Sequence, residues 1–293
     1  MFQTHSIIIL TKDRPDLLPR AVRSALQAAR PGGEVVVVDD ASLMSASEVL
    51  LANRLESNTS LRVLRRCVSE GISAARNFGI AQSGGEVIFF LDDDDTMQPD
   101  YCERILSGPA ATCDYGFSAY RLMRPDGGSQ RPKPRFATGR IPPGAPLRRH
   151  LCGMGMGFWI RRTVADATGP FATEIVINED TDYVCRLIRS RRQGWYSAEI
   201  GVDIYAHDDA DNVANITGRV DARARAQAML YVCRRHPSLV HYLGKSYLRH
   251  CAKAGMSREA AEFILRQQGL RSRVWLGAYF LGKRFIYRAV RRR

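Results

Sequence analysis

Three short apolar runs in the first third of the chain predict buried β-strands. They are SIIIL at 6–10, EVVVVD at 34–39 and EVIFFLD at 86–92, each rich in β-branched or aromatic residues. Continuous runs of this kind are typical of strands that are covered on both faces of a parallel sheet. Residues 14–29 have apolar positions at helical spacing, and 71–85 predicts a second helix closed by glycines. The order strand, helix, strand, helix, strand predicts the nucleotide-binding half of an α/β sheet.

The pattern changes after about residue 100. Residues 124–150 are crowded with proline, glycine and arginine, and predict an extended loop with one hairpin. GMGMGFWIRR at 153–162 predicts a strand, and NEDTDYVCRLIRSRR at 178–192 predicts a helix with acids in its first turn and arginines in its last. From about residue 216 onward the chain is helical and basic in pattern.

The composition is that of an ordinary globular protein. The chain has 293 residues, of which 45% are hydrophobic and 25% charged, enough for one large domain with an appendage or for two small ones. No stretch approaches the roughly 18 consecutive apolar residues of a membrane span, and the start MFQTHSIIIL lacks the order of a secretory signal. We therefore expect a cytoplasmic protein.

Cysteine usage agrees with this location. The seven cysteines are scattered and include no close pair with metal-ligand spacing, which predicts free thiols rather than disulfides or a zinc site. They are Cys67, Cys102, Cys113, Cys152, Cys185, Cys233 and Cys251.

The charge balance predicts an anionic partner. Lysine and arginine number 43 against 30 acids, a net charge of +13, which suits nucleic acid, a phosphorylated substrate or an acidic membrane surface. Residues 271–293 contain many arginines and no acid, whereas acids collect around 92–100, 179–182 and 203–211.

Four adjacent aspartates, Asp92, Asp93, Asp94 and Asp95, follow the third predicted strand. Their mutual repulsion does not help the chain fold. A D-x-D pair at a strand end can hold one hard divalent cation through its oxygens, with a diphosphate completing the coordination shell. The alternative is a solvated acidic turn that caps the next helix. So many acids at one strand end favour the metal site.

Two further groups are candidates for nucleotide binding. Asp39 and Asp40 follow the second predicted strand, where a carboxylate could accept a hydrogen bond from a base N–H or a ribose hydroxyl, or could simply cap a helix. Arg76 lies in a helix of small residues and could contact a nucleotide or phosphate. A structural ion pair from Arg76 to Asp39 or Asp40 is the alternative.

Later in the chain, Glu179, Asp180 and Asp182 crowd a predicted helix start. A carboxylate at a helix N-terminus stays ionised and suits a general base for a sugar hydroxyl. Helix capping is the alternative for these acids. His207 stands among acids, where a single histidine is either structural or a ligand.

Taken together, these motifs resemble a known family. SIIILTKDRPDLLPRAVRSAL, VVVVDDAS, GISAARNFGIAQSGGEVIFFLDDDDTMQPDY, GPF and NEDTDYVCRL, in this order and spacing, resemble family 2 of the inverting glycosyltransferases, which have the GT-A fold. The resemblance covers about residues 5–210. It implies a catalytic domain at 1–215, with a nucleotide-sugar-binding half at 1–100 and an acceptor-binding half at 101–215. A basic helical extension at 216–293 follows.

The resemblance also implies roles for individual residues. It assigns Asp180 as the catalytic base. On the acceptor side the candidates are Glu179 and Trp159, although Trp159 could equally fill the core. The nucleotide-sugar contacts that it implies are Thr11, Asp13, Asp39, Asp40, Arg76, Asp92 and Asp93, with Asp40 reading the base. The metal ligands that it implies are Asp94, Asp92, Asp95 and His207.

The implied activity is metal-dependent, inverting hexosyl transfer from a nucleotide-diphosphate sugar, with UDP expected, to a hydroxyl of a glycan or lipid-linked acceptor in cell-surface polysaccharide synthesis. The cofactor expected is Mn²⁺ or Mg²⁺. A sugar-nucleotide nucleotidyltransferase would carry a glycine-rich phosphate loop after the first strand, and LTKDRPDLL has no such glycines. A basic nucleic-acid-binding protein is the other rival. Four aspartates at the presumed cleft argue against it, so no nucleic acid is expected as a partner.

The C-terminal segment 271–293 predicts an amphipathic helix. On a helical wheel its apolar side comprises Trp275, Leu276, Tyr279, Phe280, Ile286 and Val290, with basic residues beside it. Such a helix could lie on the inner, anionic face of a membrane, near a lipid-linked acceptor. Packing on the catalytic domain, or on a second subunit in a homo-oligomer, is the alternative.

Overall fold

The computed structural model of the chain describes residues 4–134, 136–145, 153–206, 220–267 and 269–290. The chain divides into two compact units. Unit 1 comprises Met1–Thr173 and Arg186–Val213, and unit 2 comprises Glu174–Cys185 and Ala214–Arg293. The division near residue 213 lies close to the predicted end of the catalytic domain at 215. The sequence did not indicate that 174–185 would cluster with the C-terminal region.

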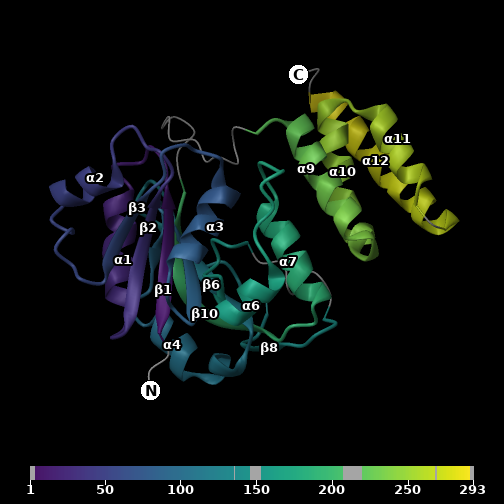
Figure 1. The fold of residues 1–293 in the computed structure, drawn as a ribbon. Coiled ribbons are helices and arrows are strands. Elements are labelled where there is room, and N and C mark those ends of the chain that lie inside the picture. The colour runs from purple at the N-terminus through teal and green to yellow at the C-terminus, as the bar shows by residue number, and fades with distance from the viewer. Residues whose placement is uncertain (1–3, 135, 146–152, 207–219, 268, 291–293) are drawn as a thin grey trace. The chain divides into compact units, whose positions relative to one another are not determined.

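Unit 1 is built on one mixed sheet of 10 strands in the order β3-β2-β1-β4-β9-β6-β10-β5, with β7 paired to β6 and β8 paired to β10 (Figure 1). The α/β architecture is therefore confirmed. The strands are β1 (His5–Thr11), β2 (Gly33–Asp39), β3 (Leu61–Arg65), β4 (Val87–Asp92), β5 (Thr96–Met97), β6 (Tyr115–Met123), β7 (Ser129–Gln130), β8 (Gly139–Ile141), β9 (Trp159–Arg161) and β10 (Gly194–Tyr205).

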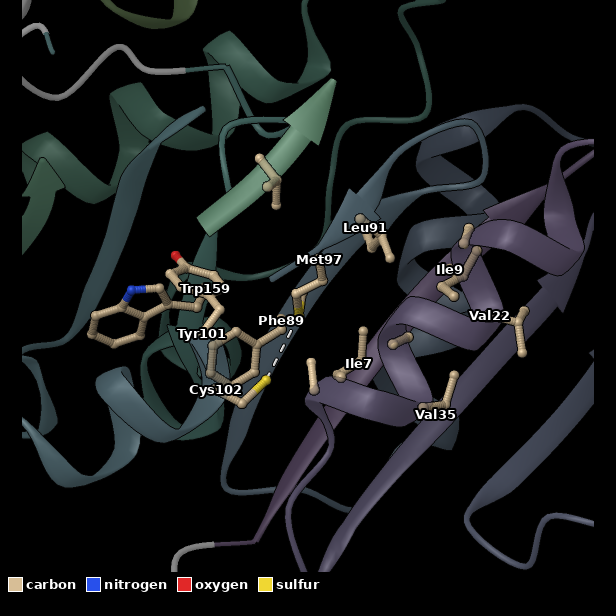
Figure 2. Packing of buried hydrophobic residues seen from close by; sticks show 14 of the residues in the cluster. Ile7, Ile9, Val22, Val35, Phe89, Leu91, Met97, Tyr101, Cys102 and Trp159 are labelled. Carbon is tan, nitrogen blue, oxygen red and sulfur yellow. Dashed lines mark hydrogen bonds between the residues drawn. The ribbon is translucent and has the colours of Figure 1, made fainter. Parts of the chain in front are cut away.

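The three predicted apolar runs form β1, β2 and β4, which lie parallel in the first half of the sheet. Because side chains alternate along a strand, Ile7 and Ile9 point to one face, with Val35 and Phe89 from the neighbouring strands in the same core cluster. The helices on this face are α1 (Leu18–Ala28), α2 (Ala46–Ala52) and α4 (Tyr101–Ser107). Figure 2 shows this core, in which Tyr101 and Cys102 pack beside Phe89.

The second predicted helix, α3 (Ile72–Gln82), contacts the same strands through the other set of side chains. A Cβ placed on Gly79 would lie 2.9 Å from Ile8 Cγ2 and 3.1 Å from Val38 Cγ2. The glycine therefore lets the helix backbone approach the sheet closely. Buried helices on both faces explain why the strands read as continuous apolar runs.

The second half of the sheet differs in detail from the prediction. The strand predicted at 153–162 is confined to Trp159–Arg161, because the glycines before it form turns. The loop predicted at 124–150 does contain one hairpin, in which β7 pairs antiparallel with β6 across the turn at 124–128, and it also contributes β8, which pairs with β10. Helix α6 (Arg162–Thr168) follows β9, and the next helix along the chain, α7 (Glu179–Arg189), is divided between the two units.

Unit 2 contains the first seven residues of α7 and a set of C-terminal helices. These are α9 (Ala222–Arg235), α10 (Val240–Ala254), α11 (Ser257–Leu265) and α12 (Leu270–Val290). The helical prediction from residue 216 onward is thus confirmed. Within the described segments, no helix is both long enough and apolar enough to span a membrane.

Helix α12 uses its predicted apolar side mainly for packing within unit 2. Leu276 is 1% exposed and Phe280 6% exposed, and the Trp275 ring stacks on His241 of α10 with ring centres 4.8 Å apart. A different stripe faces solvent, formed by Leu270, Val274, Leu281 and Phe285. Part of the predicted apolar face, formed by Leu276, Phe280 and the Trp275 ring, therefore packs within unit 2, whereas Ile286 of the same face is 50% exposed.

The six described cysteines are free, as predicted. Cys67, just after β3, is exposed, whereas the other five are buried. Cys152 lies outside the described residues.

Candidate active site

The carboxyl ends of three parallel strands meet at one edge of the sheet in unit 1. In the strand register Thr11 of β1 lies opposite Asp39 of β2, and Leu10 lies opposite Asp92 of β4. Ligands of open α/β sheets bind at such an edge. The polar residues that the sequence places after these strands are thus brought together.

Asp92, Asp94 and Asp95 form a compact carboxylate cluster. Each offers one oxygen, and these oxygens all lie within 4.8 Å of one another. Divalent cations of the Mg²⁺ class bind oxygen ligands at about 2.0–2.1 Å, so oxygens at this spacing can share one ion with little movement. This hard, all-oxygen set fits Mg²⁺ or Mn²⁺.

The electrostatics of the cluster also favour a bound cation. Asp94 and Asp95 are 8% and 4% exposed. Burial, followed by the charges of Asp92 and Asp94, raises the pKa of Asp95 to about 9. The positive charge of Arg20 acts in the opposite direction but does not offset burial and the neighbouring acids. A divalent ion would supply further positive charge.

Arg14, which the sequence analysis did not single out, lies against this cluster. Its Nη1 donates to Asp93 Oδ1 and to Asp94 Oδ2, both at 2.8 Å. The hydroxyl of Thr11 donates to the other oxygen of Asp93 at 2.7 Å. Asp93 is therefore held between the end of β1 and the loop that follows it. In the sequence, the available signal for this contact was the basic side chain of Arg14 within TKDRP.

The end of β10 contacts the cluster from another direction. The backbone N–H of Tyr205 donates to Asp95 Oδ1 at 3.0 Å. Arg20 of α1 donates to the Asp94 carbonyl at 2.5 Å, and its guanidinium lies 3.5 Å from the centre of the Tyr205 ring. These contacts fix the backbone of the acidic turn.

Gly155 lies beside the carboxylates, in the loop before β9. A Cβ at this position would stand 2.9 Å from Asp92 Oδ2 and 3.9 Å from Asp95 Oδ2. Only glycine leaves this space open. The sequence predicted a strand at 153–162 and gave no reason to connect Gly155 with the acids.

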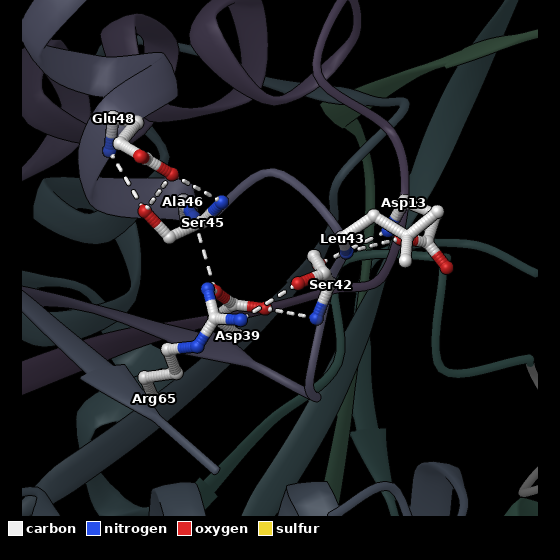
Figure 3. Close-up of polar contacts among 8 residues, drawn as sticks. All are labelled: Asp13, Asp39, Ser42, Leu43, Ser45, Ala46, Glu48 and Arg65. Carbon is white, nitrogen blue, oxygen red and sulfur yellow. Dashed lines mark hydrogen bonds and ion pairs between the residues drawn. The ribbon is translucent and has the colours of Figure 1, made fainter. Parts of the chain in front are cut away.

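Asp39 organises the loop after β2 (Figure 3). Its side chain is 1% exposed and accepts hydrogen bonds from the backbone N–H groups of Ser42 at 2.8 Å and Ala46 at 3.0 Å. Arg65, its register partner on β3, lies 3.1 Å away. The same loop holds Asp13, whose Oδ1 accepts from the Leu43 N–H at 2.7 Å. Asp39 thus accepts from the first N–H of α2, although the N-cap residue of this helix is Ser45.

Asp40 is 6% exposed and accepts from Arg66 and from the Ser69 hydroxyl, each at 2.6 Å. Asp39 and Asp40 therefore have Arg65 and Arg66 as ion-pair partners. Arg76 of α3 is 5% exposed, and its guanidinium lies 4.8 Å from the Phe171 ring centre. Its positive charge also acts on Asp92. The structure thus places Arg76 near the acidic cluster.

Trp159, for which two roles were open, fills the core. It is 1% exposed, and a Cβ on Gly116 would come within 2.7 Å of its ring. From this buried position the ring offers no surface for stacking on a sugar.

The predicted catalytic base belongs to unit 2. Asp180 is half-buried in the first turn of α7, beside the buried Glu179. Asp182, in the same turn, is fully buried. His207, the fourth predicted metal ligand, lies outside the described residues.

Parts of the chain are similar to known proteins. The chain is 33% identical over 101 residues to an uncharacterized glycosyltransferase of Haemophilus influenzae, a match covering 34% of this chain and 33% of the relative. It is 32% identical over 138 residues to the succinoglycan biosynthesis protein ExoO of Rhizobium meliloti, covering 47% of this chain and 39% of the relative. The chain thus matches well under half the length of these two relatives.

The fold resembles that of a protein whose crystal structure is known. The crystal structure of S. aureus TarS 1-349 in complex with UDP-GlcNAc matches with a TM-score of 0.67 at 14% identity, over 96% of this chain and 81% of that one. The predicted GT-A fold with C-terminal helices is thereby confirmed. The model of the family described as Glycosyl transferase family 2 matches residues 6–172, more than half of the chain. The chain therefore belongs to glycosyltransferase family 2.

Proposed function

We propose that this chain is a metal-dependent, inverting glycosyltransferase. It takes a UDP-linked sugar as donor and transfers it to a hydroxyl of a glycan or lipid-linked acceptor in cell-surface polysaccharide synthesis. The observation that carries the proposal is the cluster of Asp92, Asp94 and Asp95, with oxygens within 4.8 Å, at the sheet edge where nucleotides bind in α/β folds.

Two relatives support the choice of substrates. TarS, which shares the fold, has been crystallised with UDP-GlcNAc, and ExoO is a succinoglycan biosynthesis protein. A UDP-sugar donor and a polysaccharide acceptor are the corresponding proposals for this chain.

In the proposed reaction the donor's diphosphate would lie over the acidic cluster, and Asp92, Asp94 and Asp95 would hold Mn²⁺ or Mg²⁺. When bound, the cation would neutralise the diphosphate charge and favour its departure. Thr11 and Arg14 keep Asp93 oriented through their hydrogen bonds. Arg76 faces the same acids and would add positive charge near the phosphates. Asp40, held by Arg66 and Ser69, would read the base.

The proposed base acts on the acceptor. Asp180 would remove the proton from the acceptor hydroxyl, whose oxygen then attacks the anomeric carbon opposite the leaving group and inverts it. The half-buried carboxylate at the start of α7 suits this role, because the helix N-terminus favours its ionised form. Glu179 beside it is the proposed acceptor-side neighbour.

Calorimetric titration with UDP, GDP, dTDP and CDP, each with and without Mn²⁺, tests the proposal. We expect one diphosphate to bind only when Mn²⁺ is present, and Asp94→Ala to abolish this binding. Asp100→Ala is the matched control, because Asp100 is an exposed aspartate six residues away that pairs with Arg104. Metal-independent binding, or equal losses in both variants, would contradict the metal site.

We also propose that the exposed stripe of α12 contacts an anionic membrane surface. Leu270, Val274, Leu281 and Phe285 are each more than 60% exposed and lie within about 60° of one another on a helix of 3.6 residues per turn. Arg271, Arg273 and Arg284 flank this stripe, and residues 271–293 contain no acid. An apolar stripe with basic edges complements anionic headgroups over an acyl boundary.

Sedimentation with phosphatidylglycerol vesicles, compared with phosphatidylcholine vesicles, tests this contact. Binding should require the anionic lipid and fall about tenfold or more in Phe285→Asp, because a buried apolar contact is lost. Leu265→Asp is the control, since Leu265 is an equally exposed apolar residue on α11. If Phe285→Asp instead changes only the mass in solution, the stripe is an interface between copies of the chain.

A further inference from the structure

The start of α7 is fixed within unit 2 by a buried polar contact. Asp182, in the first turn of the helix, is 0% exposed. Its Oδ1 lies 2.8 Å from Nε2 of His236, and its Oδ2 lies 3.4 Å from Nη1 of Arg235. Two residues from the end of α9 thus hold one carboxylate of α7.

His236 makes this contact from a buried position. The residue is 0% exposed and ends α9, where its N–H donates to the Val232 carbonyl at 3.0 Å. Because a carboxylate accepts, Nε2 of the imidazole carries the hydrogen. Nδ1 has no hydrogen-bond partner in the described part of the chain. The bond to Asp182 is therefore the polar contact that explains a histidine at this place.

Helix geometry relates this contact to Asp180. At 3.6 residues per turn, two residues correspond to about 200° of rotation, so Asp180 and Asp182 leave the helix on opposite sides. A partner that holds Asp182 therefore fixes the rotation of the turn without occupying the side that carries Asp180. The half-buried state of Asp180 agrees with this division.

The energetics indicate specificity rather than stability. A buried pair of hydrogen-bonded polar groups can often be replaced by well-packed apolar residues with little loss of stability, because taking both groups out of water is costly. The main effect of such a pair is that it permits only one relative geometry of its two partners. Asp182 lies two residues from the proposed base Asp180, so its contact with His236 can hold that base in one orientation.

We propose that His236, assisted by Arg235, is a positioning residue for catalysis. Through Asp182 it fixes the first turn of α7 and so orients the Asp180 carboxylate toward the acceptor hydroxyl. The inference rests on the proposed role of Asp180. It gives the C-terminal helices a part in the reaction itself, which the family match over residues 6–172 does not cover.

The test uses the full-length chain and UDP-GlcNAc hydrolysis with Mn²⁺, in which water takes the place of the acceptor. His236→Leu should lower kcat about 100-fold, the scale expected for a catalytic group displaced by about 1 Å. The KM for UDP-GlcNAc and the Kd for UDP with Mn²⁺ should stay within about twofold, because unit 1 holds the metal cluster. His236→Gln should recover most of kcat, since its amide N–H can donate to Asp182.

Hydrogen exchange read by mass spectrometry provides a measure independent of activity. His236→Leu should increase exchange of the amides at 178–185 while leaving 5–11 and 87–92 unchanged. His250→Leu is the matched control, because His250 is also a buried histidine of unit 2 and burial lowers its pKa to about 4, which keeps it neutral. This control should leave both kcat and exchange at 178–185 near wild type.

The outcomes separate the inference from the proposed function. Wild-type kcat and wild-type exchange in His236→Leu, or equal losses in His250→Leu, overturn the positioning role. If Asp180→Asn hydrolyses UDP-GlcNAc normally, or the wild type does not hydrolyse it, the proposed function is in question and the exchange result alone decides whether His236 anchors α7. If His236→Leu does not fold, Arg235→Met serves instead, because Arg235 is 41% exposed and can be replaced without opening the core.

Discussion

At the residue scale, an arginine is bound to one of the carboxylates that are proposed to hold the cation. Arg14 shares its guanidinium between Asp93 and Asp94, at 2.8 Å from each. A divalent ion that binds Asp94 must compete with this positive charge. When no metal is bound, the positive charge of Arg14 thereby offsets part of the repulsion between these carboxylates.

We therefore predict that Arg14→Gln increases the affinity for Mn²⁺ in the absence of nucleotide, by about tenfold, which corresponds to about 1.4 kcal/mol. The reason is that one competing charge is removed from the carboxylates. Calorimetric titration with Mn²⁺ measures the effect. Arg23→Gln, at an exposed position of α1, is the control. Unchanged or weaker Mn²⁺ binding in Arg14→Gln would show that Arg14 does not compete.

The raised pKa of Asp95 predicts a pH dependence. With a pKa of about 9, Asp95 carries a proton at pH 7 when no cation is bound. Cation binding should then release about one proton, and the affinity should fall as the pH is lowered below 9. Titrations in two buffers with different ionisation enthalpies give the proton count. Asp95→Asn should show no such release, and a pH-independent affinity in the wild type would contradict the assignment.

The raised pKa of Asp95 also determines whether the free energy of unfolding rises or falls with pH. The pKa of Asp95 is 3.8 in the unfolded chain and about 9 in the folded chain without metal. Between these two pH values the folded chain therefore binds more protons at Asp95 than the unfolded chain does. The contribution of Asp95 to the free energy of unfolding therefore falls as the pH rises through this window.

At the scale of elements, the loop after β2 depends on one buried carboxylate. Asp39 accepts from two backbone N–H groups and from Arg65, and the loop that it shapes also holds Asp13. Asp39→Ala should lower the free energy of unfolding by about 3 kcal/mol, because two buried N–H groups lose their acceptor.

Urea denaturation measures this loss. Glu48→Ala is the matched control, because it removes only the exposed side chain that completes the capping box at the start of α2 and should lower the free energy of unfolding by much less than Asp39→Ala does. A loss of similar size in both variants would contradict the central role of Asp39.

The elements also show where sequence reasoning succeeds. Continuous apolar runs identified β1, β2 and β4, because strands covered on both faces need apolar residues at every position. Strands β6 and β10 carry buried or half-buried polar residues that pair only in the folded sheet, such as Arg121 with Asp203 at 2.8 Å. Their patterns therefore do not alternate cleanly, and they were not predicted.

Only part of the candidate site could be predicted from the sequence, as was the case for the strands. Thr11 and the four aspartates follow directly from strand ends, which the apolar runs locate. Arg14 and Gly155 reach the cluster through loop geometry, and no local pattern specifies it. The contact between Asp182 and His236 joins residues 54 positions apart, which a single sequence does not reveal.

At the scale of the whole molecule, the net charge of +13 predicts weak binding to polyanions. Single-stranded DNA should bind at low salt and lose about 10³-fold or more in affinity between 50 and 200 mM salt, because backbone contacts release counterions. UDP binding with Mn²⁺ should change little over this range, since buried charges are weakly screened. Fluorescence anisotropy and calorimetry make the comparison. DNA binding that survives high salt would restore the nucleic-acid-binding alternative.

The exposed thiol of Cys67 can be labelled selectively. Among the six described cysteines it alone is exposed, and it directly follows Arg66, the ion-pair partner of Asp40. With Cys152 replaced by serine, a maleimide dye should attach at Cys67 alone in the folded chain. Such a dye would stand next to the residue proposed to read the base, so its emission could report which nucleoside diphosphate is bound before any acceptor is known.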